Sequence, residues 1–127
     1  MDIETLIRMV MDCAMRVRRQ LAPGYEEKIY QTAMAIELKK SNIPFQKEAP
    51  VDVVYDDMVI GSYRCDFIVE DRLIVEVKAT STLVPANHVQ IVNYLKATGI
   101  DDGLLINFGS QHIEIKRKYR LFRQTQQ

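Results

Sequence analysis

The sequence predicts an α/β domain in which a mixed central β-sheet is flanked by α-helices. Three observations lead to this prediction: an amphipathic helical pattern opens the chain, a long β-type stretch follows, and a further helix precedes two more strands. The implied order α-α-β-β-β-α-β-β is that of a sheet covered by helices. The chain has 127 residues and shows no linker or internal repeat, so a single domain over residues 1–127 is expected.

The chain begins with two expected helices. Apolar residues recur at helical spacing over residues 3–19, and Asp2 is placed to cap that helix. A second helix is expected from near Gly24 to about Lys40, with Pro44 beyond its end. Its inward face is expected to carry Ile29, Ala33, Ile36 and Leu38.

The middle of the chain favours β-structure. Residues 49–57, 58–70 and 73–80 are rich in β-branched and aromatic residues that alternate with polar ones, which is typical of strands. A short polar break separates the second segment from the third. Three consecutive strands are therefore expected.

A third helix is expected over residues 84–99, because Pro85 falls in its first turn and Gly99 just past its end. The almost wholly apolar segment 102–109 is typical of a strand covered on both faces. Residues 112–122 alternate and are basic, which predicts a last strand.

Composition and charge are those of an ordinary folded protein, with 47% hydrophobic and 27% charged residues. The net charge is zero, so a nucleic-acid partner would have to be held by a local basic patch. No apolar run approaches the roughly 20 residues that a membrane span needs, and the N-terminus is unlike a signal peptide. A cytoplasmic location is expected, without a membrane partner. Cys13 and Cys65 fit no zinc or disulfide spacing and are expected to be buried thiols.

The register of the hairpin formed by the second and third strands brings two acids together. Side chains alternate along a strand, so the apolar faces of the two strands must coincide. These faces are expected to carry Cys65, Phe67 and Val69 on one strand and Leu73, Val75 and Val77 on the other. A three-residue loop then sets Val69 opposite Leu73 and Asp66 opposite Glu76, with Lys78 one step further along the same face.

Such a cluster suits a divalent cation, because two adjacent carboxylates repel each other unless a cation intervenes. Mg²⁺ prefers oxygen ligands and is usually held by one or two carboxylates, waters and substrate phosphate. A bound ion could activate water and polarise a phosphodiester, and Lys78 could orient the nucleophile or stabilise negative charge. The alternative is a modest surface ion pair without catalytic meaning.

At this point the residues resemble a known signature. An Asp followed after a gap by Glu-x-Lys on a hairpin marks the PD-(D/E)XK nuclease superfamily, and here it reads Asp66, then Glu76-Val77-Lys78. Cys65 stands where a proline usually precedes the Asp.

A closer resemblance covers most of the chain. The stretch "GYEEKIY" matches the motif of the GxxExxY family, which is assigned to that superfamily. The blocks "YRCDFIVEDRLIVEVKA", "HVQIVNYLKATG" and "GLLINFG" are similar to its remaining blocks, in the same order.

The resemblance implies a restriction-endonuclease-like core and a metal-dependent nuclease that hydrolyses phosphodiester bonds of nucleic acid. The implied catalytic residues are Glu27, Asp66, Glu76, Lys78 and Gln90. Mg²⁺ or Mn²⁺ would be held by Asp66, Glu76 and the backbone carbonyl of Val77, with Glu27 as a further candidate ligand. Gln90 and Tyr94 match a Gln-x-x-x-Tyr motif that part of the superfamily carries on the helix after the hairpin, and they share one helix face.

The outlying residues also have structural explanations. Glu27 lies in the first turn of a helix, where an acid is favourable, and Glu26 beside it could do the same. Tyr30 is better explained by packing, Gln90 could merely bridge backbone groups, and His88 is not expected to be a ligand. The basic tail could contact phosphate or simply protect a strand edge. Its basic residues are Lys116, Arg117, Lys118, Arg120 and Arg123.

Nucleic acid is the expected partner, with DNA favoured, and the neutral charge and small size favour a homodimer or an accessory protein. The main alternative is a catalytically weak or inactive module that binds nucleic acid or protein on a nuclease-like fold. A metal-independent hydrolase built on Asp66 and Lys78 ranks last, because no Ser or Cys nucleophile lies beside a base.

Overall fold

The structure is a computed structural model that describes residues 1–121. Its elements are α1 (Ile3–Gln20), α2 (Glu27–Lys40), β1 (Phe45–Tyr55), β2 (Met58–Val69), β3 (Leu73–Lys78), α3 (Pro85–Thr98), β4 (Asp102–Asn107) and β5 (Glu114–Tyr119). Their order is the predicted one.

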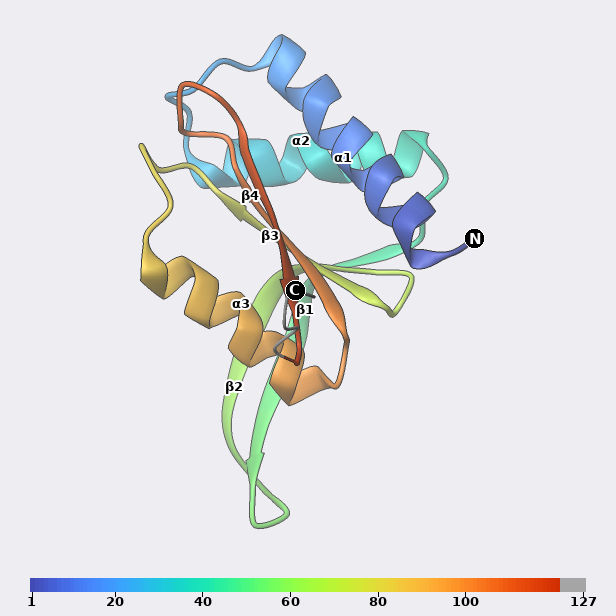
Figure 1. Cartoon of the computed structure of the whole chain (residues 1–127), viewed down its shortest axis with the longest axis vertical. Helices are drawn as coiled ribbons and strands as arrows, with labels where there is room; N and C mark the ends of the chain where they lie inside the picture. The colour runs from blue at the N-terminus through green and yellow to red at the C-terminus, as the bar shows by residue number, and fades with distance from the viewer. Residues whose placement is uncertain (122–127) are drawn as a thin grey trace, which may run out of the picture.

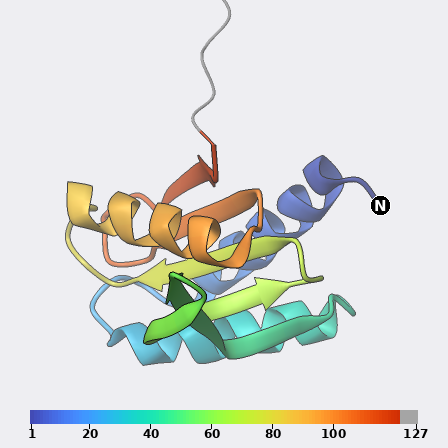
Figure 2. The same cartoon turned by 90° about the horizontal axis from the view of Figure 1, so that it is seen from below.

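The five strands form a single mixed sheet in the order β1-β2-β3-β4-β5. All neighbouring pairs are antiparallel except β3 and β4, which are parallel and are connected through α3. Helices α1 and α2 lie together (Figure 1), and Figure 2 shows α2 and α3 on opposite sides of the sheet. The prediction of a mixed sheet flanked by helices is confirmed.

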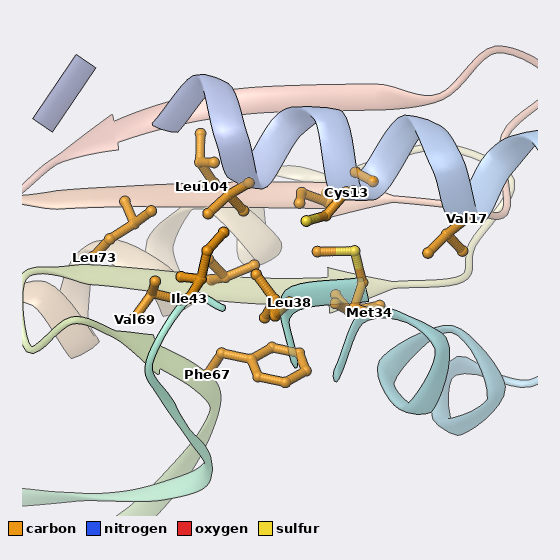
Figure 3. Close-up of a cluster of buried hydrophobic side chains, with 14 of the residues drawn as sticks. Cys13, Val17, Met34, Leu38, Ile43, Phe67, Val69, Leu73 and Leu104 are labelled. Carbon is orange, nitrogen blue, oxygen red and sulfur yellow. The ribbon is translucent and has the colours of Figure 1, made fainter. Parts of the chain in front are cut away.

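Two apolar clusters hold these layers together. The larger one joins α1 and α2 to the sheet, and Figure 3 shows Cys13, Met34 and Phe67 among its members. The smaller one joins α3 to the other face through residues such as Ile74 and Ile91. Both cysteines are buried thiols, as predicted. Every residue of β4 is buried, which confirms a strand covered on both faces.

Helix α2 begins later and faces differently than expected. It begins at Glu27 because the backbone of Glu26 is still extended, with ψ of 152°, and Gly24, with φ of 119°, is also outside the helical conformation. Its buried positions include Tyr30, Met34 and Leu38, whereas Ile29 and Ile36 are 45% and 53% exposed. The inward-facing prediction was wrong for the two isoleucines, because the ring of Tyr30 stacks on Phe108 and fixes which face of the helix turns inward.

The β1–β2 hairpin extends well beyond the body of the protein (Figure 1). We call its outer part, residues 52–63, the arm. Tyr55 pairs with Met58 across a two-residue turn, in which Asp56 and Asp57 have φ of 49° and 61°. Positive φ at both central residues is the signature of the tight turn that suits the natural twist of a hairpin.

Close to Asp66, the alternating side chains of β2 switch from one face of the sheet to the other. Phe67 and Val69 pack in the cluster under α1 and α2, but Cys65 packs in the cluster under α3. Between the pairs Lys47–Phe67 and Ala49–Cys65 lies Glu48, whose φ of 54° interrupts the regular extended backbone. The prediction that Cys65 shares a face with Phe67 and Val69 was therefore wrong.

Within residues 1–121, none of the helices combines the length and the apolar character that crossing a bilayer requires.

Candidate active site

The candidate site lies where β2 and β3 separate. The two strands pair through Val69–Leu73, Ile68–Ile74 and Phe67–Val75, which confirms the predicted register. One further step would place Asp66 opposite Glu76, but the strand ladder ends before that pair. Beyond Val75, the backbone groups of β3 that face β2 no longer pair with that strand, so side chains can bond to them.

Asp66 and Glu76 replace the missing ladder with reciprocal side-chain bonds. The backbone N–H of Asp66 donates to Glu76 Oε2 at 2.7 Å. The backbone N–H of Val77 donates to Asp66 Oδ2, also at 2.7 Å. Each carboxylate is therefore fixed by the opposite strand, so the predicted juxtaposition of the two acids is present and rigidly held.

Helix α2 contributes two further polar side chains. Gln31 Nε2 donates to Asp66 Oδ1 at 2.9 Å and to Glu27 Oε1 at 3.3 Å, so it bridges the two acids. Partial burial raises the pKa of Glu27, the charge of Asp66 adds to this, and Lys78 opposes it. Glu27 therefore lies within electrostatic reach of both Asp66 and Lys78.

Lys78 closes the site on the side of α3. Its Nζ donates to Gln90 Oε1 at 2.9 Å. Tyr94, one turn further along α3, is buried, and its pKa is raised by that burial and then by the charge of Glu76. The structure thus brings all five predicted site side chains into one region, and Tyr94 borders it.

The surroundings of Glu76 strongly disfavour its ionised form. It is 3% exposed, and desolvation together with the nearby charge of Asp66 raises its pKa to about 8. The N–H of Asp66 and the charge of Lys78 act in the opposite direction. A carboxylate whose ionised form is disfavoured in this way is stabilised either by a neighbouring cation or by binding a proton.

The donor set fits a hard divalent cation that keeps part of its own shell. Asp66 and Glu76 offer oxygen atoms, and the open edge of β3 at Val77 offers a carbonyl. Among residues 1–121, no three His, Cys, Asp or Glu side chains assemble into a metal-binding group. Mg²⁺ suits such a partial set, because it is commonly held by one or two carboxylates with water and phosphate completing the coordination.

The end of β4 fixes the chain just after Lys78. Phe108 N–H donates to the Lys78 carbonyl oxygen at 2.8 Å. The buried amide of Asn107 accepts from Thr80 N–H at 3.0 Å and donates to Thr80 O at 2.9 Å. A Cβ on Gly109 would lie 2.4 Å from backbone atoms of Ala79 and Thr80, so only glycine fits there.

Gln31, Asn107 and Gly109 are neighbours of the candidate site that were not predicted from the sequence. Gln31 had one usable signal, since it lies four residues after Glu27 and so on the same helix face. Asn107 had a usable signal too, because an amide at the end of an almost wholly apolar, buried strand must find hydrogen-bond partners.

Several of the other candidates have partners within residues 1–121. Tyr30 is fully buried and its hydroxyl donates to the carbonyl of Ala22, which supports packing. Lys118 Nζ lies 3.1 Å from His88 Nδ1. Arg117 pairs with both Glu4 and Asp102, and Arg120 with Asp101, so these tail residues already have acidic partners. Arg123 lies outside the described residues.

Comparison with known proteins agrees with the fold. The family model described as "PD-(D/E)XK nuclease superfamily" matches residues 4–118. A crystal structure of the protein SSO0001 is similar with a TM-score of 0.57 and 16% sequence identity over 72% of this chain, a likeness of fold alone. The match spans 48% of SSO0001, about half its length. No curated protein matches the chain significantly.

Proposed function

Because the chain belongs to the PD-(D/E)XK nuclease superfamily, we propose that it is a metal-dependent nuclease that hydrolyses phosphodiester bonds of nucleic acid at the Asp66–Glu76–Lys78 site. The observation that carries the proposal is the pair of carboxylates locked across the split between β2 and β3, with an amine beside them. On this view the chain forms one catalytic domain.

In this proposal Asp66 and Glu76 hold Mg²⁺ or Mn²⁺. The carbonyl of Val77 is a third ligand, because the N–H and C=O groups of one strand residue point to the same side, and Val77 N–H already points to Asp66. Glu27 is a further candidate, directly or through water. When bound, the ion supplies an activated water and neutralises charge on the phosphate.

Lys78 stabilises the negative charge that develops on the phosphate, or orients the attacking water. Gln90 holds its ammonium group in position through the 2.9 Å bond to Nζ. Gln31 orients Asp66 from the other side. Lys78 and Gln90 thus form the amine side of the site, and Asp66, Glu76 and Gln31 the carboxylate side.

The direct test is a cleavage assay with single- and double-stranded DNA, RNA and branched DNA, in Mg²⁺, Mn²⁺ or EDTA. Wild type is compared with Glu76→Gln, which keeps an oxygen for the Asp66 N–H but removes the charge. Cutting that needs metal and disappears in the variant supports the proposal. Equal cutting by both proteins indicates a contaminant and counts against it.

A binding module without turnover is the second candidate, and one observation favours it. Three oxygens of the acid pair already accept hydrogen bonds from Gln31, Val77 and Asp66 within the chain. Retained binding of nucleic acid with no cleavage under any metal would identify this case. Membership of the GxxExxY family, a cytoplasmic location, the preference for DNA, and a homodimer or accessory protein stay predictions.

A further inference from the structure

A groove lies between the arm and helix α3. Its volume is about 1000 Å³. Most of its lining is apolar, from residues such as Val53, Val54 and Val89, and its polar groups come mainly from α3. Figure 1 shows the β1–β2 hairpin passing beside this helix.

The groove is continuous with the candidate active site. Gln90 lines the groove and also accepts the hydrogen bond from Lys78 Nζ. Tyr94 lines the groove one helical turn further on, and it is close enough to Glu76 for that charge to contribute to its raised pKa. A ligand in the groove would therefore extend from the same point at which Lys78 meets its phosphate.

The lining offers an exposed aromatic ring, that of Tyr63. Tyr63 is 54% exposed, and its ring centroid lies 6.0 Å from that of the buried Tyr94 at a tilt of 43°. The inner ring supports the outer one, which leaves the outer ring free to contact a ligand. Stacking on such a ring suits any nucleobase, because every base has a π-face.

The polar groups of the groove match the edges and backbone of a nucleotide. The amides of Gln90 and Asn93 both donate and accept hydrogen bonds, and Lys96 adds a positive charge. A surface made only for duplex phosphates would be lined mainly by basic residues instead. The apolar and aromatic lining therefore favours a base over a phosphate track.

We infer that this groove binds an unpaired nucleotide next to the cleaved phosphate, so that the enzyme acts on single-stranded or unpaired nucleic acid rather than on intact duplex. The inference rests on the proposed function for the identity of the ligand. A base within a duplex is stacked and paired, and could enter only after being turned out of the helix. The turn of the arm carries Asp56 and Asp57, whose charges would repel phosphates. The bound nucleic-acid strand would therefore run along α3 rather than outward along the arm.

The test measures binding without turnover. A fluorescent single strand of about ten nucleotides and the same sequence as a duplex are titrated in Ca²⁺, with fluorescence anisotropy as the readout. Tyr63→Ala removes the stacking surface and Tyr63→Phe keeps it. Tyr55→Ala is the matched control, because Tyr55 is also on the arm and is 67% exposed but does not line the groove.

The expected result is that wild type prefers the single strand and that Tyr63→Ala weakens this binding by about 5- to 150-fold. Tyr63→Phe and Tyr55→Ala should bind like wild type. Unchanged affinity in Tyr63→Ala, equal affinity for the duplex, or no binding by wild type would overturn the inference.

A different occupant would also be detected. If sedimentation shows a dimer that Tyr63→Ala dissociates, and the single strand does not bind, the groove is a contact between two copies of the chain and the inference is wrong. The cleavage assay separates the two proposals. Cutting of duplex that is lost in Glu76→Gln but unchanged in Tyr63→Ala would retain the nuclease and reject the nucleotide groove.

Discussion

Lys78 Nζ donates to Gln90 Oε1 at 2.9 Å, joining the end of β3 to the middle of α3. An amide oxygen that accepts from an ammonium group fixes the position of the amine without removing its charge. We therefore propose that Gln90 is a positioning residue that acts through Lys78, and this relationship can be tested separately from catalysis itself.

We expect Lys78→Ala to lower the single-turnover cleavage rate at saturating substrate by about 100-fold or more, as for the loss of a group that stabilises the transition state. Gln90→Ala should lower it less. The double variant should be no slower than Lys78→Ala, because Gln90 then has nothing to position. Additive losses in this rate would contradict an action through Lys78.

The stability of the metal-free protein should depend on pH through Glu76. Its folded pKa of about 8 is above the ordinary 4.5, so between these values the folded state binds more protons than the unfolded state. The Glu76 contribution is therefore fully present below about pH 4.5 and is lost as the pH rises to about 8. In EDTA, the free energy of unfolding of wild type should fall by at least about 1.4 kcal/mol more than that of Glu76→Gln. Parallel pH profiles from urea denaturation would refute this assignment.

Divalent cations should stabilise the fold. At a concentration tenfold above its Kd, Mn²⁺ adds about 1.4 kcal/mol, which corresponds to roughly 5 °C in the Tm of a chain of this size. Asp66→Asn should abolish this rise, because it removes one of the two carboxylates. The measurement is differential scanning fluorimetry across a Mn²⁺ titration. An equal rise in the variant would place the ion elsewhere.

Gln31 should matter for the metal rather than for the fold. Its Nε2 fixes Asp66 Oδ1 at 2.9 Å, and loss of such a supporting bond typically weakens metal affinity about 10- to 100-fold. We expect Gln31→Leu to raise the Mn²⁺ Kd by that factor in calorimetric titration. Thr32→Ala, on the exposed neighbouring position of α2, is the control. Identical Kd values in both variants would exclude a supporting role.

Gly109 should tolerate no side chain. Gly109→Ala would place a Cβ 2.4 Å from backbone atoms of Ala79 and Thr80, directly after Lys78. We expect a loss of about 1–3 kcal/mol in unfolding free energy, together with reduced cleavage. Gly61→Ala is the matched control, since its Cβ would meet its neighbours at 3.8 Å and beyond. Urea denaturation of both variants checks the difference, and equal stabilities would show that the loop after β3 can move aside.

Local patterns were sufficient to predict most of the fold. Hydrophobic period and turn residues gave all eight elements in order. The face of α2 was mistaken because the choice between Ile29 and Tyr30 depends on Phe108, far away in the chain. The face of Cys65 was mistaken because the backbone at Glu48, on the neighbouring strand, interrupts the regular alternation. Both errors come from tertiary contacts that periodicity does not contain.

The acidic part of the site could also be predicted from the sequence. Asp66 and Glu76 belong to one hairpin, so the register alone places them together, although it does not reveal that their side chains replace the strand ladder. Gln31 and Asn107 act across different elements, and the sequence shows neither their partners nor their distances. The roles of all these residues in catalysis stay predictions until the assays are made.

The parallel pairing of β3 with β4 has a consequence for the order in which the site is assembled during folding. The two acids meet as soon as a short hairpin closes, whereas the backbone of Lys78 is held only after the whole crossover through α3 has returned and Phe108 N–H has bonded to the Lys78 carbonyl oxygen. Pairings between distant segments form more slowly than local ones. We therefore expect the folding chain to gather its negative charges before the end of the strand that carries Lys78 is anchored, and a divalent cation in the medium should speed folding by relieving that early repulsion.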